Sequence, residues 1–99
     1  MEIKKTITDD TAEVALTGRL DTLTSSSLEA ALDEILDQVT YLVFDFTELE
    51  YISSAGLRVL LTAQKMLSKK GGHVTVKNCT PEVKEVFTIT GFADILEII

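Results

Sequence analysis

Cysteine, histidine and proline each occur only once among the 99 residues, and tryptophan is absent. The single cysteine, Cys79, excludes an internal disulfide and any metal site built from several cysteines. No apolar run approaches the roughly 18 residues that a membrane-spanning helix needs. The first six residues interrupt their two apolar side chains with polar ones, whereas a secretory signal carries a continuous apolar stretch. These absences predict a cytoplasmic chain without membrane insertion.

Basic side chains are also scarce, since nine Lys and Arg stand against sixteen Asp and Glu and the net charge is −7. Nucleic acids and anionic membranes repel such an acidic chain, so neither is expected as the main partner. The hydrophobic fraction of 45% is that of a globular protein. The length suits one hydrophobic core, and no linker or internal repeat interrupts it. Residues 1–99 are therefore expected to form a single domain that binds another protein.

The residue sets on which most enzymes depend are missing as well. His73 is the only histidine and has no Ser and Asp at catalytic spacing. Gly71 and Gly72 lack the spacing and the Lys-Ser/Thr pair of a phosphate-binding loop. Asp45 could act as a catalytic acid or a metal ligand in another fold, but no cluster of carboxylates and histidine converges on it. We therefore expect no catalytic residue, no metal site and no cofactor, and a chain that is the substrate of an enzyme rather than an enzyme.

Apolar residues follow two periods along the chain. Alternation or short apolar runs predict strands over residues 3–8, 12–17, 41–46 and 73–76. A period of 3.6 predicts helices from the hydroxyl-rich cluster 22–27 to Val39, from Ser54 to Lys70, and from Pro81 to Gly91. Residues 95–99 suit either a strand or a short helix. This alternation predicts an α/β fold with a mixed sheet of four to five strands, flanked by about four helices on at least one face.

Three finer expectations concern how these elements begin, end and pack. Gly18 is expected to end the second strand. Thr24, Ser25 or Ser26 is expected to cap the first helix, with Ser26 and Glu29 at the spacing of a capping box. The run 41–46 is nearly all apolar, which predicts a strand buried on both faces.

The segment 43–57 is the most informative part of the chain. It reads as a strand and a tight turn that place Ser54 at the start of a helix, where free N–H groups and the helix dipole favour negative charge. A hydroxyl held there is well placed to carry a phosphate. Alternatively, Ser53 or Ser54 simply caps the helix, and Ser53 is expected to be a cap rather than a second phosphoacceptor. Gly56 either lets a partner approach the backbone or permits close packing against a neighbouring strand.

The whole chain resembles the STAS family, which includes bacterial anti-sigma factor antagonists. The resemblance rests on several ordered motifs: Gly18-Arg19-Leu20-Asp21, Asp45 to Ile52, Ser53-Ser54-Ala55-Gly56-Leu57, Cys79-Thr80-Pro81-Glu82-Val83 and Thr90-Gly91-Phe92. In the antagonists the serine that matches Ser54 accepts a phosphate. Two positions depart from the family pattern, because Ser53 replaces the usual Asp and Arg19 replaces a commoner acidic residue. These departures suggest a partner different from the best-known sporulation and stress kinases.

The resemblance implies a phosphorylation-gated switch. The unmodified domain would bind an ATP-dependent serine kinase that doubles as an anti-sigma factor, and binding would release a sigma factor. Phosphorylation of Ser54 would abolish binding, and a PP2C-type phosphatase would restore it. The partner-binding surface is expected to include the phosphoacceptor turn and its neighbours: Asp21, Ser53, Ser54, Ala55, Gly56, Leu57 and Arg58.

Two other functions remain open. One is a constitutive scaffold that uses the same fold without phosphorylation, such as a subunit of a lipid-transport ATPase complex. The other is nucleotide binding by the domain itself, against which the acidic balance and the missing phosphate loop both argue. A further feature bears on the partner: Arg58, Lys65 and Lys69 share one helical face that begins beside Ser54. That face is either a solvated stripe or a contact for an acidic surface of the kinase.

Overall fold

The computed structural model describes all 99 residues, which form five strands and three α-helices. The strands are β1 (Glu2–Thr8), β2 (Thr11–Leu20), β3 (Tyr41–Ile52), β4 (His73–Lys77) and β5 (Glu97–Ile98). The α-helices are α1 (Ser25–Asp33), α2 (Ser54–Ser68) and α3 (Pro81–Thr90), and two short 3-10 helices cover Leu36–Gln38 and Phe92–Asp94. All strands belong to one sheet in the order β1-β2-β3-β4-β5, with β1 antiparallel to β2 and the other pairs parallel. The predicted α/β fold with a mixed sheet is confirmed, with three α-helices where about four were expected.

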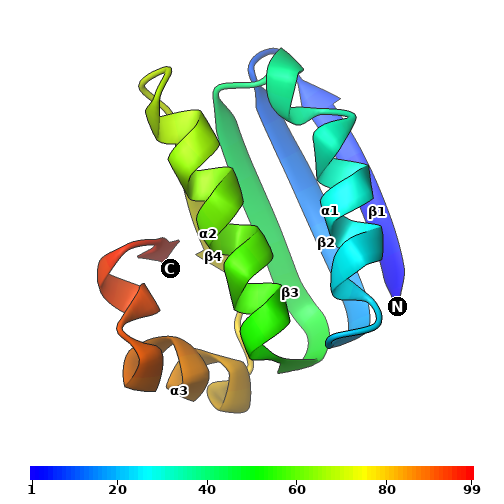
Figure 1. The fold of residues 1–99 in the computed structure, drawn as a ribbon, viewed down its shortest axis with the longest axis vertical. Helices are drawn as coiled ribbons and strands as arrows, with labels where there is room; N and C mark the ends of the chain where they lie inside the picture. The colour runs from blue at the N-terminus through cyan, green and yellow to red at the C-terminus, as the bar shows by residue number, and fades with distance from the viewer.

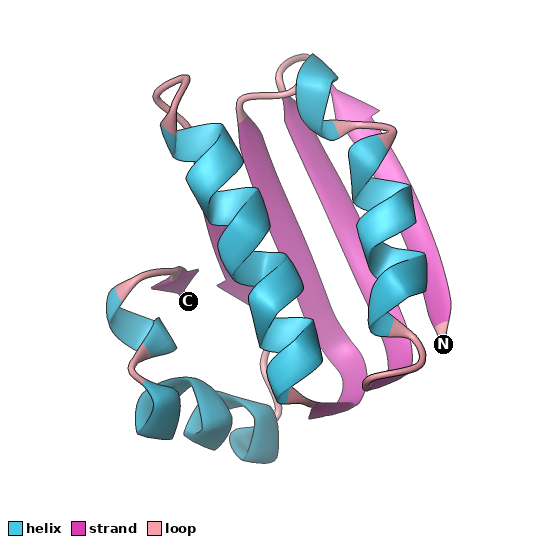
Figure 2. Ribbon diagram, in the orientation of Figure 1, coloured by secondary structure: helices cyan, strands magenta, loops and turns pink.

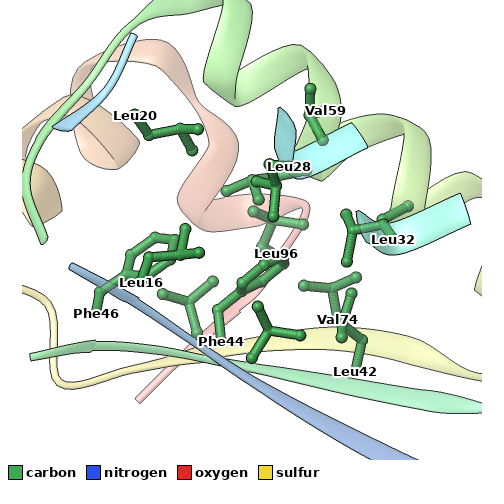
Figure 3. Packing of buried hydrophobic residues seen from close by; sticks show 14 of the residues in the cluster. Leu16, Leu20, Leu28, Leu32, Leu42, Phe44, Phe46, Val59, Val74 and Leu96 are labelled. Carbon is green, nitrogen blue, oxygen red and sulfur yellow. The ribbon is translucent and has the colours of Figure 1, made fainter. Parts of the chain in front are cut away.

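The helices α1 and α2 lie side by side on the same face of the sheet, and α3 lies beside the start of α2 (Figures 1 and 2). Alternate residues of β2 and β3 point to this face, because successive side chains of a strand point to opposite sides. Together with apolar residues of β4, the helices and the connecting segments, they form one core of 24 buried hydrophobic residues, part of which Figure 3 shows around Phe44 and Phe46. The ring of Phe46 also stacks on that of Phe87 from α3, with centroids 6.3 Å apart.

The other face of the sheet carries no helix, and this overturns the expectation that residues 41–46 are buried on both faces. Leu42, Phe44 and Phe46 are buried, whereas Tyr41, Val43 and Asp45 are only half-buried. Polar side chains hold this open face together. Lys77 Nζ reaches across β3 to Glu13 Oε1 at 2.9 Å, and Thr75 Oγ1 donates to Glu97 Oε1 at 2.6 Å.

Three element ends differ from the prediction, and one of them is the end of β3, which reaches Ile52 instead of residue 46 because it stays paired with β2 as far as Leu20. Gly18 does not end the second strand. It adopts a φ of 104° within β2, which continues to Leu20 with two shifts of register against β3. The first helix ends at Asp33 instead of Val39, since the chain must turn there to enter β3. The carbonyl oxygen of Asp10 fixes the end of that turn by accepting from the N–H groups of Thr40 and Tyr41, at 2.7 and 3.1 Å. The final segment is a two-residue strand, one of the two forms expected for it.

The predicted capping box of the first helix is wrong. Ser26 lies inside the first turn of α1, and its hydroxyl donates to the carbonyl oxygen of Leu23. Thr24, one of the three expected caps, occupies the N-cap position, but its side chain bonds the preceding loop instead of the helix.

None of the three helices has the length and apolar character that crossing a bilayer requires.

Candidate functional site

The predicted phosphoacceptor turn lies at the edge of the sheet where β2 and β3 end and where α1 and α2 begin, at the lower end of the view in Figure 1. The two strand ends are joined there, because the N–H of Ser53 donates to the carbonyl oxygen of Leu20 at 2.8 Å. This bond continues the β2–β3 ladder beyond the pair Leu20–Ile52. The loop that starts α1 and the turn that starts α2 are therefore neighbours.

The two serines of the turn have different environments. Ser53 has an extended backbone and occupies the N-cap position of α2, where its Oγ accepts from the N–H of Gly56 at 3.2 Å. Ser54 is the first residue of the helix and is exposed, and its hydroxyl makes no hydrogen bond within the molecule. As predicted, Ser53 is the cap. Capping by Ser53 leaves the hydroxyl of Ser54 available at the end of the helix where backbone N–H groups lack partners.

Gly56 and Leu57 face inward from this turn. A Cβ at Gly56 would lie 2.7 Å from Cγ of Leu20 and 3.1 Å from Cγ1 of Ile52, so the position has no room for a side chain. This geometry supports close packing against the strands as the role of the glycine. Leu57 is 5% exposed and belongs to the core, while Ala55 is half-buried. The exposed side chains of the predicted set on α2 are those of Ser54 and Arg58.

Asp21 shapes the neighbouring loop between β2 and α1. Its Oδ1 accepts from the N–H groups of Leu23 and Thr24, both at 3.0 Å, and from the Thr24 hydroxyl at 3.1 Å. The bond from the Thr24 N–H is the largest cause that holds the pKa of Asp21 below its ordinary value, and the Arg19 charge acts in the same direction. The carboxylate therefore stays ionised and orders its own turn, one residue beyond the carbonyl that receives Ser53.

Arg19 and Tyr51 form a contact that the sequence did not reveal. They become register partners only after the irregularity between Gly18 and Arg19. The guanidinium carbon of Arg19 then lies 4.2 Å from the centroid of the Tyr51 ring, within the range of a cation–π interaction. Both side chains are exposed, at the strand ends that precede the two helix starts.

Arg58 lies one helical turn after Ser54 and lines a shallow groove between the starts of α1 and α2. The polar part of this groove consists of Ser25, Ser26, Glu29 and Thr62. Glu48 and Glu50 of β3 are exposed. The groove and the turn together form a polar surface that includes the exposed Ser54 hydroxyl, the Glu29 carboxylate of α1 and, as the nearest cation on α2, Arg58.

The other side chains considered as reactive groups have ordinary structural roles. Asp45 accepts from the hydroxyl and N–H of Thr47 and from Asn78, and the Thr47 hydroxyl is the largest cause that keeps the pKa of Asp45 low. Burial raises the pKa of the Cys79 thiol to about 11, against the opposing effect of Lys84, so the thiolate is scarce near neutral pH. His73 packs edge-on against Tyr41 with ring centroids 5.2 Å apart. No group of three or more His, Cys, Asp or Glu is arranged to hold a metal ion.

Comparison with known proteins agrees with this arrangement. The sequence model of the STAS domain family matches residues 2–99 of this chain. BtrV of Bordetella bronchiseptica, which carries an assignment as an anti-sigma factor antagonist, is 38% identical over 84 residues, or 84% of this chain and 72% of the relative. The anti-sigma F factor antagonist of Paenibacillus polymyxa is 31% identical over 87 residues, or 86% of this chain and 74% of the relative.

A solved structure has the same fold. The unphosphorylated form of the anti-sigma factor antagonist SpoIIAA gives a TM-score of 0.87 at 22% identity, with 99% of this chain and 88% of SpoIIAA covered. The β-sheet order and the helices on one face described above are thus an arrangement that other proteins share.

Proposed function

The chain belongs to the STAS domain family, and on this basis we propose that it is an anti-sigma factor antagonist controlled by phosphorylation of Ser54. In its unmodified form it binds an anti-sigma serine kinase, and this binding releases a sigma factor. Phosphate on Ser54 ends the binding, and a PP2C-type phosphatase removes it. The names of two relatives, each more than 30% identical, support the antagonist role.

One observation carries the phosphorylation step: of the two serines at the start of α2, Ser53 uses its hydroxyl to cap the helix and Ser54 does not. The Ser54 hydroxyl is exposed and is free to receive a phosphoryl group. The N-terminus of α2 and Arg58, four residues further on, would then stabilise the added charge. A phosphate is therefore accommodated by the domain itself while it changes the surface that a partner meets.

The switch follows from charge. A phosphate adds about −1.5 to −2 charges at pH 7 to a site that otherwise presents a neutral hydroxyl. A partner surface that packs against this hydroxyl would have to desolvate the phosphate and would face its repulsion. A penalty of about 3 kcal/mol weakens binding more than a hundredfold, which is enough for a switch.

The test is the affinity of three proteins for the kinase purified from the native cells. We expect Ser54→Ala to bind the kinase like the unmodified wild type and to keep this affinity when ATP is added, because it cannot be phosphorylated. Ser54→Asp should bind about a hundredfold more weakly. Titration calorimetry measures the three affinities. Equal affinity of the two variants would refute the gating role of Ser54.

Phosphosite mapping by mass spectrometry on protein from growing and stressed cells gives an independent check. Phosphate on Ser54 whose occupancy changes with growth condition is the expected result. Full coverage of that peptide without phosphate in any condition would instead favour a constitutive scaffold.

A further inference from the structure

The basic side chains of this acidic protein are unevenly distributed. From Tyr51 to Pro81 the sequence carries five Lys and Arg and no Asp or Glu, although the whole chain has sixteen acidic residues. This stretch includes α2, which is the one α-helix of the three without an acidic residue. The charge of the molecule is therefore reversed locally, over the helix that begins at Ser54.

Three of these five cations are free. Lys70 Nζ donates to the carbonyl oxygen of Leu36 at 2.6 Å, and Lys77 pairs with Glu13. The other three, Arg58, Lys65 and Lys69, are exposed, and none of the ion pairs in the molecule includes them. We call these three residues the α2 basic stripe. At a rise of about 1.5 Å per residue, the stripe extends to about 22 Å from Ser54 along the helix axis.

The charges beside the stripe restrict what can bind to it. Glu29 and Asp33 of α1 line a second shallow groove together with Thr62 and Met66 of α2. A broad anionic surface, such as a lipid bilayer or a nucleic acid duplex, would cover both helices and would be repelled by the carboxylates of α1. A protein can instead place a few carboxylates over α2 alone, so the charge pattern fits an acidic protein surface that runs along α2.

We infer that the α2 basic stripe docks an acidic surface of the kinase and so extends the binding site well beyond Ser54. This inference rests on the proposed function, because it names the surface chemistry of the partner at the same site. Ser54 lies at the head of the stripe and one turn from Arg58. A phosphate there would lower the charge of this helix face from three positive charges to about one, so phosphorylation weakens the attraction along α2 as well as the contact at Ser54.

The experiment compares charge reversals at matched and distant positions. The variant Lys65→Glu/Lys69→Glu changes the two stripe residues that lie furthest from Ser54. The control Lys4→Glu/Lys84→Glu gives the same net charge through exposed residues of β1 and α3. The kinase source is a fraction of native cell extract, chosen because it transfers phosphate from ATP to the wild type and not to Ser54→Ala. The purified variants are its substrates. Initial rates at several protein concentrations give kcat/KM, and circular dichroism melting verifies the fold of each variant.

We expect K65E/K69E to lower kcat/KM at least tenfold and K4E/K84E to leave it within about twofold, because only the first pair faces the partner. The wild-type rate should fall as salt rises from low to high concentration, and the rate of K65E/K69E should depend on salt much less. If K65E/K69E melts early, Lys65→Gln/Lys69→Gln replaces it and should give an intermediate loss.

Other outcomes overturn the inference in distinguishable ways. Equal kcat/KM for wild type and K65E/K69E would refute docking along α2 while leaving the proposed function intact. If wild type binds phosphatidylglycerol vesicles or duplex DNA and K65E/K69E does not, while phosphate transfer is unchanged, the stripe would be assigned to that ligand instead. A wild-type dimer that K65E/K69E dissociates, again with unchanged transfer, would assign it to a second copy of the chain. Absence of any transfer to wild-type Ser54 would refute the proposed function and the inference together.

Discussion

Single residues at the start of α2 are specialised within a very short distance along the chain. Ser53 has an oxygen bound to the Gly56 N–H, Ser54 has an exposed hydroxyl, and Gly56 has no space for a side chain. The cap position could be recognised in the sequence, because a serine before a helical apolar pattern is a strong signal. Close packing of Gly56 against a strand was one of two interpretations, but the sequence could not name Leu20 and Ile52 as its neighbours, because they approach it only through the ladder between β2 and β3.

Gly56→Ala tests this packing. An alanine gains up to about 1 kcal/mol of helix propensity over glycine. Its methyl group would nevertheless lie 2.7 Å from Cγ of Leu20, closer than Cβ atoms are found in proteins, and 3.1 Å from Cγ1 of Ile52, closer than most. Forced overpacking of this kind costs about 1–3 kcal/mol, so we expect a net loss of stability in urea unfolding followed by circular dichroism.

The control for Gly56→Ala is Thr62→Ala, which changes an exposed residue of the same helix and meets no new neighbour. It should be neutral or slightly stabilising. A Gly56→Ala protein as stable as wild type would mean that Leu20 moves aside at little cost.

At the scale of elements, α2 is built to tolerate negative charge at its first residue. A carboxylate at that position interacts favourably with the helix dipole by about 0.3–1 kcal/mol. We therefore expect Ser54→Asp to melt at or slightly above the temperature of wild type. Ser53→Ala removes the cap and should cost about 0.5–2 kcal/mol.

Thermal melting of both variants beside Ser54→Ala separates the two effects. This comparison also supports the gating experiment, because a Ser54→Asp protein that is fully folded can lose its partner only through the contact surface. A clear drop in the melting temperature of Ser54→Asp would contradict the proposed accommodation of phosphate at the head of α2.

The positions of elements were more predictable than their ends. Periodicity located β1, α2, β4 and α3 within a few residues. The helices α2 and α3 each pack one apolar face against the core, whereas β1 is exposed along nearly all of its length and was located by alternation alone. The ends of β2 and α1 were mispredicted for a different reason. Gly18 takes a positive φ within a strand. The helix α1 ends before Val39 because the following segment turns toward β3, where the carbonyl oxygen of Asp10 accepts from the N–H groups of Thr40 and Tyr41. Both depend on contacts between segments that no local pattern contains.

At the scale of the whole molecule, the sheet is covered on one face only, and this asymmetry was hidden in the sequence. The apolar run of β3 suggested two buried faces, whereas Tyr41 and Val43 are half-buried on a face held by polar contacts such as Lys77–Glu13. The placement of Ser53, Ser54 and Arg58 at the start of one helix was predictable, because these residues are close in sequence. The pairing of Arg19 with Tyr51 requires the register between β2 and β3, so the sequence alone could not supply it.

The same network of polar contacts makes the stability of the whole molecule depend on acidity. Hydrogen bonds from Thr24, Thr47 and Lys5 respectively are the largest causes that lower the pKa values of Asp21, Asp45 and Glu34. A carboxyl group with a lowered folded-state pKa stabilises the fold above its unfolded pKa of about 3.9 for Asp or 4.3 for Glu, and this contribution is lost as the pH falls through the folded value. Self-repulsion does not add to the loss above about pH 4.5, because the net negative charge declines toward the isoelectric point of about 4.5.

We therefore expect the melting temperature to change little between pH 7 and 5 and to fall steadily below about pH 4, as these carboxylates gain protons. Asp45→Asn tests the share of one group, because the amide keeps an oxygen to accept from Thr47 but does not titrate. Its acid decline should be shallower than that of wild type, while Asp37→Asn, which changes a carboxyl with no hydrogen bond or ion pair in the structure, should leave the profile unchanged. Melting followed by circular dichroism from pH 2 to 7 gives all three profiles. Parallel declines for wild type and Asp45→Asn would show that the Asp45 carboxylate gains nothing from its contacts with Thr47 and Asn78.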